Sequence, residues 1–376
     1  MFFNRLQLLG SAATTPALWQ NSNMVRHFCE TLKYLIQKIM QRFFLVGLVF
    51  LFKASFGQAD LKKEMKIYSF ESPKYGKVEF CTFISTIEKK KPLLIFIHGS
   101  GNHPTFEYHK DLKSYNRAAF MEVEQYKDKF HVIYVAKPGV PLFDTVQKDP
   151  INFSTSYPTS KEFIDKFSLE WRAETASLII DKAIKLLPVE TSKILVIGHS
   201  QGGQVAPKVA VLNNKVTHCV MLNCNSLNHL YDFVLQERLA ALKGETTFEE
   251  SQKNIDSLFA EYKRIFAEPK SKTKYFYDET FYRWASFSDE TPLENMLKLK
   301  IPIYLIAGGK DIYGSVTMNT DYAEIEFLRY RKTNLTYKVY PNANHFLQDE
   351  IVENGKTKLV NRKAEIFENI VEWAEK

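Results

Sequence analysis

The feature that most constrains this chain is a glycine-rich turn between an apolar run and a helical pattern. The run ILVI at residues 194–197 leads directly into Gly198-His-Ser200-Gln-Gly202, and a helical pattern follows over residues 204–212. A strand-to-helix turn this tight leaves no room for side chains at its flanking positions, which explains the glycines. Such a turn lifts the Ser200 hydroxyl above the end of a sheet, beside a helix amino terminus whose N–H groups favour negative charge. Ser200 is therefore the candidate nucleophile.

The chain around this turn alternates short β-rich runs with longer helical patterns, which is typical of an α/β sheet. Several runs, such as LLIFI at 93–97, are almost continuously apolar, as expected of strands buried on both faces. Residues 163–187 carry an apolar stripe at helical spacing and predict one long helix. The first two runs have no helix between them and predict an antiparallel hairpin. The runs predict a mostly parallel eight-stranded sheet flanked by helices, with strands near 65–70, 77–85, 93–98, 131–135, 194–198, 218–224, 302–307 and 335–340.

One connection in this pattern is much longer than a usual crossover between strands. Residues 226–299 are helix-rich, polar and aromatic, and they lie between two predicted strands of the sheet. We interpret them as an inserted helical cap, or lid, on a core formed by residues 60–225 and 300–376. The alternative is a set of peripheral helices with no part in function.

A second glycine-rich segment, His98-Gly99-Ser100-Gly101, follows the buried run LLIFI. Acyl transfer needs two N–H donors that stabilise the oxyanion of the tetrahedral intermediate. We expect one donor from Gln201, the residue after the candidate nucleophile, and the other from Ser100 in this loop.

An acid and a histidine follow the candidate nucleophile in the order that a serine triad on such a sheet requires. Asp311 lies beyond a glycine turn at the end of a buried run, where a carboxylate can orient a histidine. The preceding strand end offers only the amides of Asn223 and Asn225, which cannot do this. His345 is the only histidine after Asp311 and lies on a loop after the last predicted strand.

The four segments HGSG, GHSQGG, GGKD and NANH, in this order and spacing, resemble those of the α/β-hydrolase superfamily over about residues 65–376. The resemblance implies an esterase- or lipase-like serine hydrolase with a helical cap and no metal or organic cofactor. It also implies that Ser200 attacks a carbonyl while His345, oriented by Asp311, takes its proton and passes it to the leaving group. Water then releases the acid from the acyl-enzyme.

The expected activity is hydrolysis of a carboxylic ester, and the expected partner is a small-molecule ester or other acyl substrate. Three alternatives stay open: a serine peptidase similar to the prolyl-oligopeptidase catalytic domain, an acyl thioesterase, and a hydrolase-like binding protein without catalysis. The complete set of triad residues disfavours the binding protein, but the motifs do not separate the three enzymes. The sequence predicts neither the acyl chain length nor the oligomeric state.

The motifs and the charge of the chain give no indication of a metal site or of a surface that binds nucleic acid. No H-E-x-x-H or paired C-x-x-C motif is present, so we expect no metal. The net charge is +7, but residues 1–59 hold six basic residues against one acid, which leaves the body nearly neutral. A surface that binds nucleic acid is therefore not expected.

The amino-terminal segment predicts export. Residues 43–52 read FFLVGLVFLF, a length that matches the apolar region of a signal peptide rather than a membrane span. Residues 40–59 form a well-proportioned signal peptide with small residues at Gly57 and Ala59, and we interpret residues 1–39 as an over-extended start. The protein is then expected to be periplasmic or secreted. The alternative is an uncleaved anchor at residues 43–52, which is the only segment expected to contact a membrane.

Overall fold

The structure is a computed structural model that describes residues 61–85, 87–117, 121–149, 154–312 and 316–376. The predicted leader at residues 1–59, with its signal peptide at 40–59 and its apolar run at 43–52, lies outside the described residues. Among the residues that the structure describes, no helix is long and apolar enough to cross a membrane.

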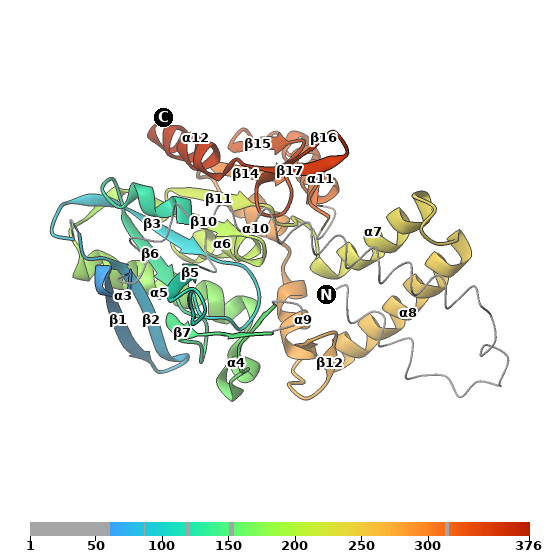
Figure 1. Ribbon diagram of the computed structural model, residues 1–376, viewed down its shortest axis with the longest axis horizontal. Coiled ribbons are helices and arrows are strands. Elements are labelled where there is room, and N and C mark those ends of the chain that lie inside the picture. Colours follow the sequence, from blue (N-terminus) through green and yellow to red (C-terminus); the bar gives the residue numbers. More distant parts are fainter. Residues whose placement is uncertain (1–60, 86, 118–120, 150–153, 313–315) are drawn as a thin grey trace. The chain divides into compact units, whose positions relative to one another are not determined.

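Eight strands form the central sheet, in the order β1-β2-β6-β3-β10-β11-β14-β15 (Figure 1). β1 and β2 form the predicted antiparallel hairpin, β2 is also antiparallel to β6, and every other neighbouring pair is parallel. The sequence prediction of a mostly parallel eight-stranded sheet is confirmed. Its strands are β1 (Met65–Ser72), β2 (Gly76–Phe83), β3 (Lys91–Ile97), β6 (His131–Val135), β10 (Val189–His199), β11 (His218–Leu222), β14 (Ile303–Gly308) and β15 (Leu335–Tyr340).

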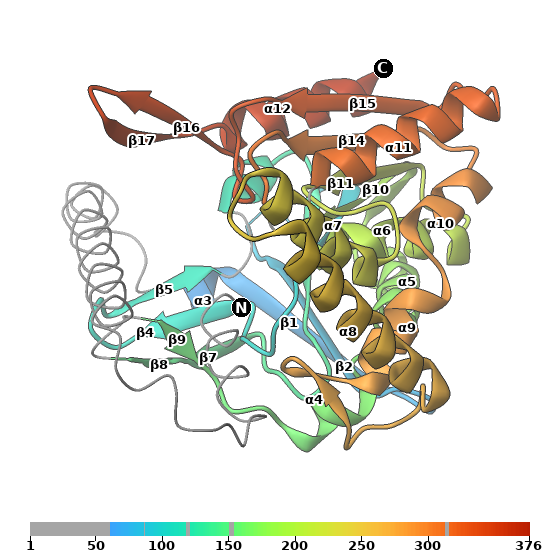
Figure 2. The same cartoon turned by 90° about the vertical axis from the view of Figure 1, so that its right-hand side faces the viewer.

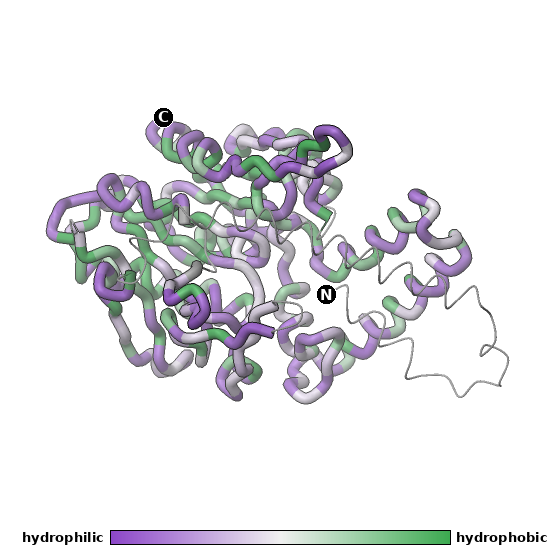
Figure 3. Tube along the Cα trace, in the orientation of Figure 1, coloured by the Kyte–Doolittle hydropathy of each residue, from purple (hydrophilic) through white to green (hydrophobic). Residues whose placement is uncertain are grey.

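Helices cover both faces of this sheet because its strands are apolar on both sides. Along β3, Leu93 and Ile95 pack with one set of helices, whereas Leu94 and Phe96 pack on the opposite face. Figure 3 shows the hydrophobic residues concentrated along these strands. The first face is covered by α5 (Leu169–Leu186), α6 (Gln201–Leu212), α10 (Pro292–Lys298) and α11 (Val316–Arg329), and the second by α3 (Leu61–Glu64), the 3-10 helix η3 (Met121–Tyr126) and α12 (Lys363–Glu375).

The prediction of one continuous helix over residues 163–187 is wrong, because the structure divides this segment into α4 (Lys161–Lys166) and α5. Phe167 ends α4 in an extended conformation, and Ser168 caps α5 by accepting a hydrogen bond from Trp171 N at 3.1 Å. The serine side chain thereby accepts from an N–H group at the start of α5 that would otherwise donate to a carbonyl oxygen within one continuous helix. The apolar stripe runs through both helices and hides the break.

The segment predicted as a cap has an apolar cluster of its own. Leu230, Ile255 and Trp284 belong to this cluster, separately from the two that flank the sheet. By contrast, Leu293 and Met296 of α10 belong to the core beside the sheet. Figures 1 and 2 show α7 and α8 side by side, with α9 next to them. The cluster is formed by α7 (His229–Leu242), α8 (Phe248–Ala267), β12 (Tyr275–Phe276) and α9 (Phe281–Asp289), and β12 pairs with the short strand β13 (Glu279–Thr280).

Besides the β12–β13 pair, three small sheets complete the described structure. One has the order β5-β4-β7 and lies in the connections on either side of β6, and another is a hairpin directly after the loop that carries His345. Their strands are β4 (Phe106–His109), β5 (Ser114–Arg117), β7 (Phe143–Thr145), β8 (Gln147–Lys148), β9 (Thr155–Ser156), β16 (Gln348–Glu353) and β17 (Lys356–Asn361).

Candidate active site

Ser200 lies between β10 and α6 in a strained backbone conformation. Its φ is 56° and its ψ is −127°, and its hydroxyl makes no capping hydrogen bond to α6. Non-glycine residues at positive φ are rare and gather at functional sites. A Cβ at Gly198 would lie 2.0 Å from the carbonyl oxygen of Gly202, so the turn tolerates only glycine there. The local sequence therefore forces the sharp turn that presents Ser200.

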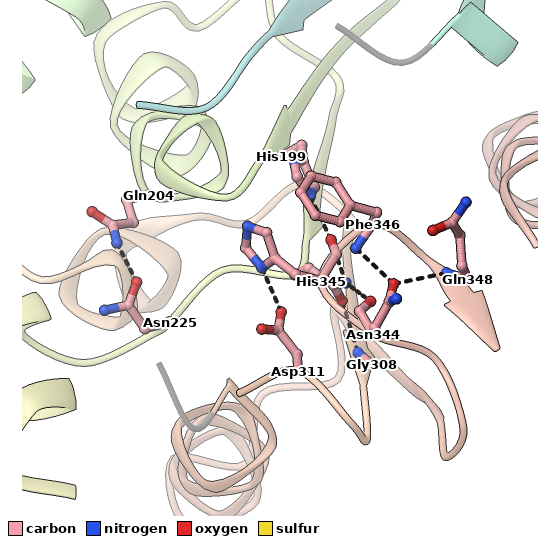
Figure 4. A network of polar contacts seen from close by, with 10 residues as sticks. His199, Gln204, Asn225, Gly308, Asp311, Asn344, His345, Phe346 and Gln348 are labelled. Carbon is pink, nitrogen blue, oxygen red and sulfur yellow. Dashed lines mark hydrogen bonds and ion pairs between the residues drawn. The ribbon is translucent and has the colours of Figure 1, made fainter. Parts of the chain in front are cut away.

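Asp311 and His345 are brought together from two separate loops. His345 Nδ1 lies 2.8 Å from Asp311 Oδ2, and the Asp311 side chain is fully buried (Figure 4). An ionised carboxylate only accepts hydrogen bonds, so Nδ1 carries the proton and Nε2 is left as the basic nitrogen. Asp311 follows β14, and His345 lies between β15 and β16. Adjacent parallel strands thus deliver an acid–histidine pair to one edge of the sheet.

The backbone of the histidine loop is held by two side chains that the sequence analysis did not assign to the site. Asn223 Nδ2 donates to the carbonyl oxygens of Asn344 and His345 at 2.8 and 3.0 Å, and Asn223 Oδ1 accepts from Gly308 N at 2.7 Å. His199 Nε2 lies 2.9 Å from the same His345 carbonyl oxygen. Burial lowers the pKa of His199 well below its usual value, so this imidazole is neutral and donates from Nε2.

Asn223 could have been found from its place in the sequence. It follows β11 directly, between the strands that carry Ser200 and Asp311. Its φ of 42° is a conformation that asparagine tolerates better than most residues. Asn223 is unsuitable as an acid, but its amide fits a different task, because it can accept and donate hydrogen bonds at the same time.

The loop after β3 lies directly against Ser200, the candidate nucleophile. A Cβ at Gly99 would be 3.3 Å from Ser200 Cβ and 3.6 Å from Ser200 Oγ. β3 and β10 are neighbouring parallel strands, so their carboxyl ends meet at one edge of the sheet. Ser100 belongs to this loop, and Gln201 is the first, buried residue of α6. The two N–H groups expected to stabilise an oxyanion therefore come from segments that meet at Ser200.

The aromatic side chains of the segment between β11 and β14 serve mainly as packing. Trp284 and Phe281 are 1% and 0% exposed, and Trp284 Nε1 donates to the Phe276 carbonyl oxygen at 2.8 Å. Trp284 also makes edge contacts with the rings of Phe233 and Phe276. These contacts belong to the cluster of α7, α8 and α9.

No group of three histidine, cysteine or acidic side chains suited to hold a metal occurs among the described residues. His103 and His109, which lie near the loop after β3, both contact Glu107, at 2.8 and 3.3 Å. They form a small polar cluster around β4. The three cysteines in the described part of the chain are free and buried.

Comparison with known proteins identifies the superfamily. The family model described as "BAAT / Acyl-CoA thioester hydrolase C terminal" matches residues 181–349, a range that contains Ser200, Asp311 and His345. Pyrococcus horikoshii acylaminoacyl peptidase aligns with 88% of this chain and 43% of its own, at 13% identity and a TM-score of 0.51. This chain belongs to the α/β-hydrolase superfamily.

A second solved structure agrees with this assignment of the fold. It is an acylaminoacyl peptidase in complex with Z-Gly-Gly-Phe-chloromethyl ketone, at 12% identity and a TM-score of 0.54, aligned over 83% of this chain and 41% of its own. This α/β-hydrolase thus spans less than half the length of the two peptidases. At such identities the likeness concerns the fold alone, and no curated protein sequence matches the chain significantly.

Proposed function

We propose that this α/β-hydrolase is a serine hydrolase that cleaves a carboxylic ester through an acyl-enzyme intermediate. Ser200 is the nucleophile, His345 the general base and acid, and Asp311 the residue that orients the histidine. The observation that carries the proposal is the 2.8 Å contact between His345 Nδ1 and the buried carboxylate of Asp311, at the same sheet edge as the strained Ser200.

The steps follow from the chemistry of these side chains. His345 Nε2 removes the Ser200 proton as Oγ attacks the carbonyl carbon, and the imidazolium that forms is stabilised by Asp311. The N–H groups of Ser100 and Gln201 stabilise the oxyanion. The tetrahedral intermediate collapses, His345 protonates the leaving alcohol, and water then attacks the acyl-enzyme by the same route in reverse.

An acyl thioesterase is the second candidate. The family model that matches residues 181–349 is described as an acyl-CoA thioester hydrolase domain, and this range includes all three proposed catalytic residues. Thioester and ester cleavage use the same acyl-enzyme, so the triad is compatible with both. A serine peptidase is supported only by the fold of the two acylaminoacyl peptidases.

Labelling with a fluorophosphonate probe tests the activity. The wild-type protein is expected to react, and Ser200→Ala is expected to lose both labelling and hydrolysis while its melting temperature changes little, because alanine keeps the backbone of the turn. The matched control is Ser257→Ala, which should label normally. Ser257 lies on α8, far from the elbow in sequence, and its hydroxyl donates to Lys253 O at 3.0 Å. Retention of a tenth of the wild-type turnover in Ser200→Ala would show that another residue is the nucleophile.

A substrate panel then separates the candidates. It contains p-nitrophenyl esters, acyl-CoAs and aminoacyl amides, each compared by kcat/KM with the active protein. Preference for the p-nitrophenyl esters supports the proposed ester hydrolase, preference for the acyl-CoAs supports the thioesterase, and preference for the amides supports the peptidase. A wild-type protein that neither labels nor turns over any of them would indicate a binding protein.

A further inference from the structure

Two buried cationic side chains lie directly behind the loop that contains Ser100. Arg172 extends from α5 and is 4% exposed, and Lys137 follows β6 and is 5% exposed. In the described part of the chain their hydrogen bonds go to backbone carbonyls and to one side-chain amide, and neither lies within ion-pair distance of a carboxylate. Burial of charged groups is costly unless their hydrogen bonds are satisfied. The burial of these two side chains without a carboxylate partner therefore needs a structural or functional reason.

Arg172 links the two segments that meet at Ser200. Its Nη1 donates to Gln201 Oε1 at 2.9 Å, and its Nη2 donates to the carbonyl oxygen of His98. The guanidinium is a rigid fork, so these two hydrogen bonds fix the start of α6 relative to the loop after β3. The His98 ring itself makes no hydrogen bond within the described structure, so the loop is held through the His98 carbonyl.

Lys137 holds the other half of the loop. Its Nζ donates to the carbonyl oxygens of Ser100 and Gly101 at 2.9 and 2.5 Å. The Ser100 N–H belongs to the peptide unit between Gly99 and Ser100. The carbonyl of the preceding unit is held by Arg172, and the carbonyl of the following unit by Lys137. Peptide units are planar and trans, so fixing both neighbours restricts the direction of the Ser100 N–H.

The ring of Phe167 offsets part of the cost of burying these cations. The Arg172 guanidinium and the Lys137 ammonium lie 5.5 and 5.9 Å from the centre of this ring. Cations within about 6 Å of an aromatic face are attracted by its quadrupole. Arg283 of α9 lies 5.7 Å from the same ring but, within the described residues, makes no hydrogen bond to the loop.

We propose that Arg172 and Lys137 are positioning residues that hold the N–H groups of Ser100 and Gln201 in the geometry that binds the oxyanion, an inference that rests on the proposed function. Neither residue touches the reacting atoms. They hold the peptide units on either side of the Ser100 N–H and the side chain of Gln201. These groups determine where the two N–H donors point.

The two residues contribute in different ways, Arg172 through its charge and Lys137 through its hydrogen bonds. Burial and nearby Arg283 lower the pKa of Arg172 to about 9, so the guanidinium stays charged at neutral pH and its field favours a developing oxyanion. Burial lowers the pKa of Lys137 well below its usual value. The ammonium and the neutral amine both have the two N–H groups that its two carbonyl partners require, so the hydrogen bonds of Lys137 do not depend on its charge.

The test compares Arg172→Met and Lys137→Met with the wild-type enzyme. The measurements are kcat and KM for the best p-nitrophenyl ester, the rate of fluorophosphonate labelling, and the Kd of phenylboronic acid, which forms a tetrahedral adduct with a nucleophilic serine. Removal of one oxyanion donor lowers kcat by about 10²–10³-fold. Because these variants displace donors without deleting them, kcat is expected to fall about 10- to 100-fold. KM should change little, and the affinity for the boronic acid should fall in parallel with kcat.

Two matched controls distinguish this role from the general loss of a buried cation. Lys91 is 6% exposed, donates to Lys127 O at 2.7 Å, and begins β3 at the end opposite the loop. Lys91→Met and Arg283→Met are expected to keep kcat within about threefold of the wild type. If Arg172→Met or Lys137→Met fails to fold, Arg172→Lys and Lys137→Arg replace them. The first keeps a charge but loses the fork, so a partial loss of kcat is expected.

Three results would overturn the inference. The first is an unchanged kcat in folded Arg172 and Lys137 variants, and the second is an equal loss in the Lys91 or Arg283 control. The third is a rise in KM with constant kcat, which would place these residues in substrate binding. Failure of the proposed function looks different, because the wild-type protein itself would then neither label nor hydrolyse.

Discussion

Single residues at this site are held in conformations that they would not adopt alone. Ser200 has φ 56°, and such strain costs about 1–3 kcal/mol at a non-glycine residue. The surrounding backbone maintains it, since Ser200 N donates to Leu222 O and Gly203 N donates to Ser200 O, both at 2.9 Å. Asn223, at φ 42°, similarly holds the histidine loop. The fold thus supplies the free energy that keeps Ser200 and His345 in these conformations.

At this scale, Asp311→Asn is expected to reduce kcat by about 10⁴-fold with little change in stability. The amide can donate to His345 Nδ1 and so favours the tautomer in which Nε2 is protonated and cannot act as a base. The measurement is kcat on the best ester, with the melting temperature as a check of folding. Asp349→Asn is the comparison, because Asp349 pairs with Arg362 at 2.8 Å and not with the histidine. Near-normal activity of Asp311→Asn with a large loss in Asp349→Asn would move the acid to the later position.

At the scale of elements, the helices between β11 and β14 form a unit that packs on itself. Trp284 is 1% exposed and lies in an apolar cluster formed by α7, α8 and α9, apart from the clusters beside the sheet. α10 packs against the sheet instead, through Leu293 and Met296. The role of residues 226–299 as a lid over the active site stays a prediction.

Trp284→Ala is expected to destabilise this helical unit by about 3–5 kcal/mol, as is usual for a buried tryptophan. Because the cluster is separate from the sheet, hydrogen exchange should accelerate in α7, α8 and α9 while β3 and β10 keep their protection. Phe259→Ala on α8, at a side chain that is 47% exposed, should have a much smaller effect. Equal loss of protection in the sheet would mean that the helices and the sheet unfold as one unit.

At the scale of the whole molecule, charge and hydrophobicity divide the chain at about residue 59. The first 59 residues carry six of the basic side chains, one acidic side chain and the apolar run at 43–52. These observations support the proposal that the hydrolase body is exported and that residues 40–59 direct it.

The export proposal predicts that the mature protein begins at Asp60, after cleavage behind Ala59. Gly57 and Ala59 are the small residues that a signal peptidase requires at this position. Amino-terminal sequencing of protein from native cells measures the result directly. An intact leader in the membrane fraction would favour the anchor at residues 43–52, and an intact leader in the cytosol would contradict both proposals.

Local sequence patterns were sufficient to predict the strand-to-helix turn at Ser200, the order of the candidate nucleophile, acid and histidine, and the mostly parallel sheet. These features depend on local rules: glycine where a Cβ cannot fit, apolar runs where both strand faces are buried, and loops after strand ends. The break between α4 and α5 is also local, but the apolar stripe across Ser168 concealed it.

The side chains that support the candidate site are apparent only in the folded structure. Arg172 lies 29 positions before its partner Gln201, and Asn223 lies 122 positions before His345. Such pairs carry no periodic signal, because their partners are backbone carbonyls and amides that any residue provides. Local sequence determines where the backbone turns, whereas contacts between distant segments determine which buried polar group satisfies which other.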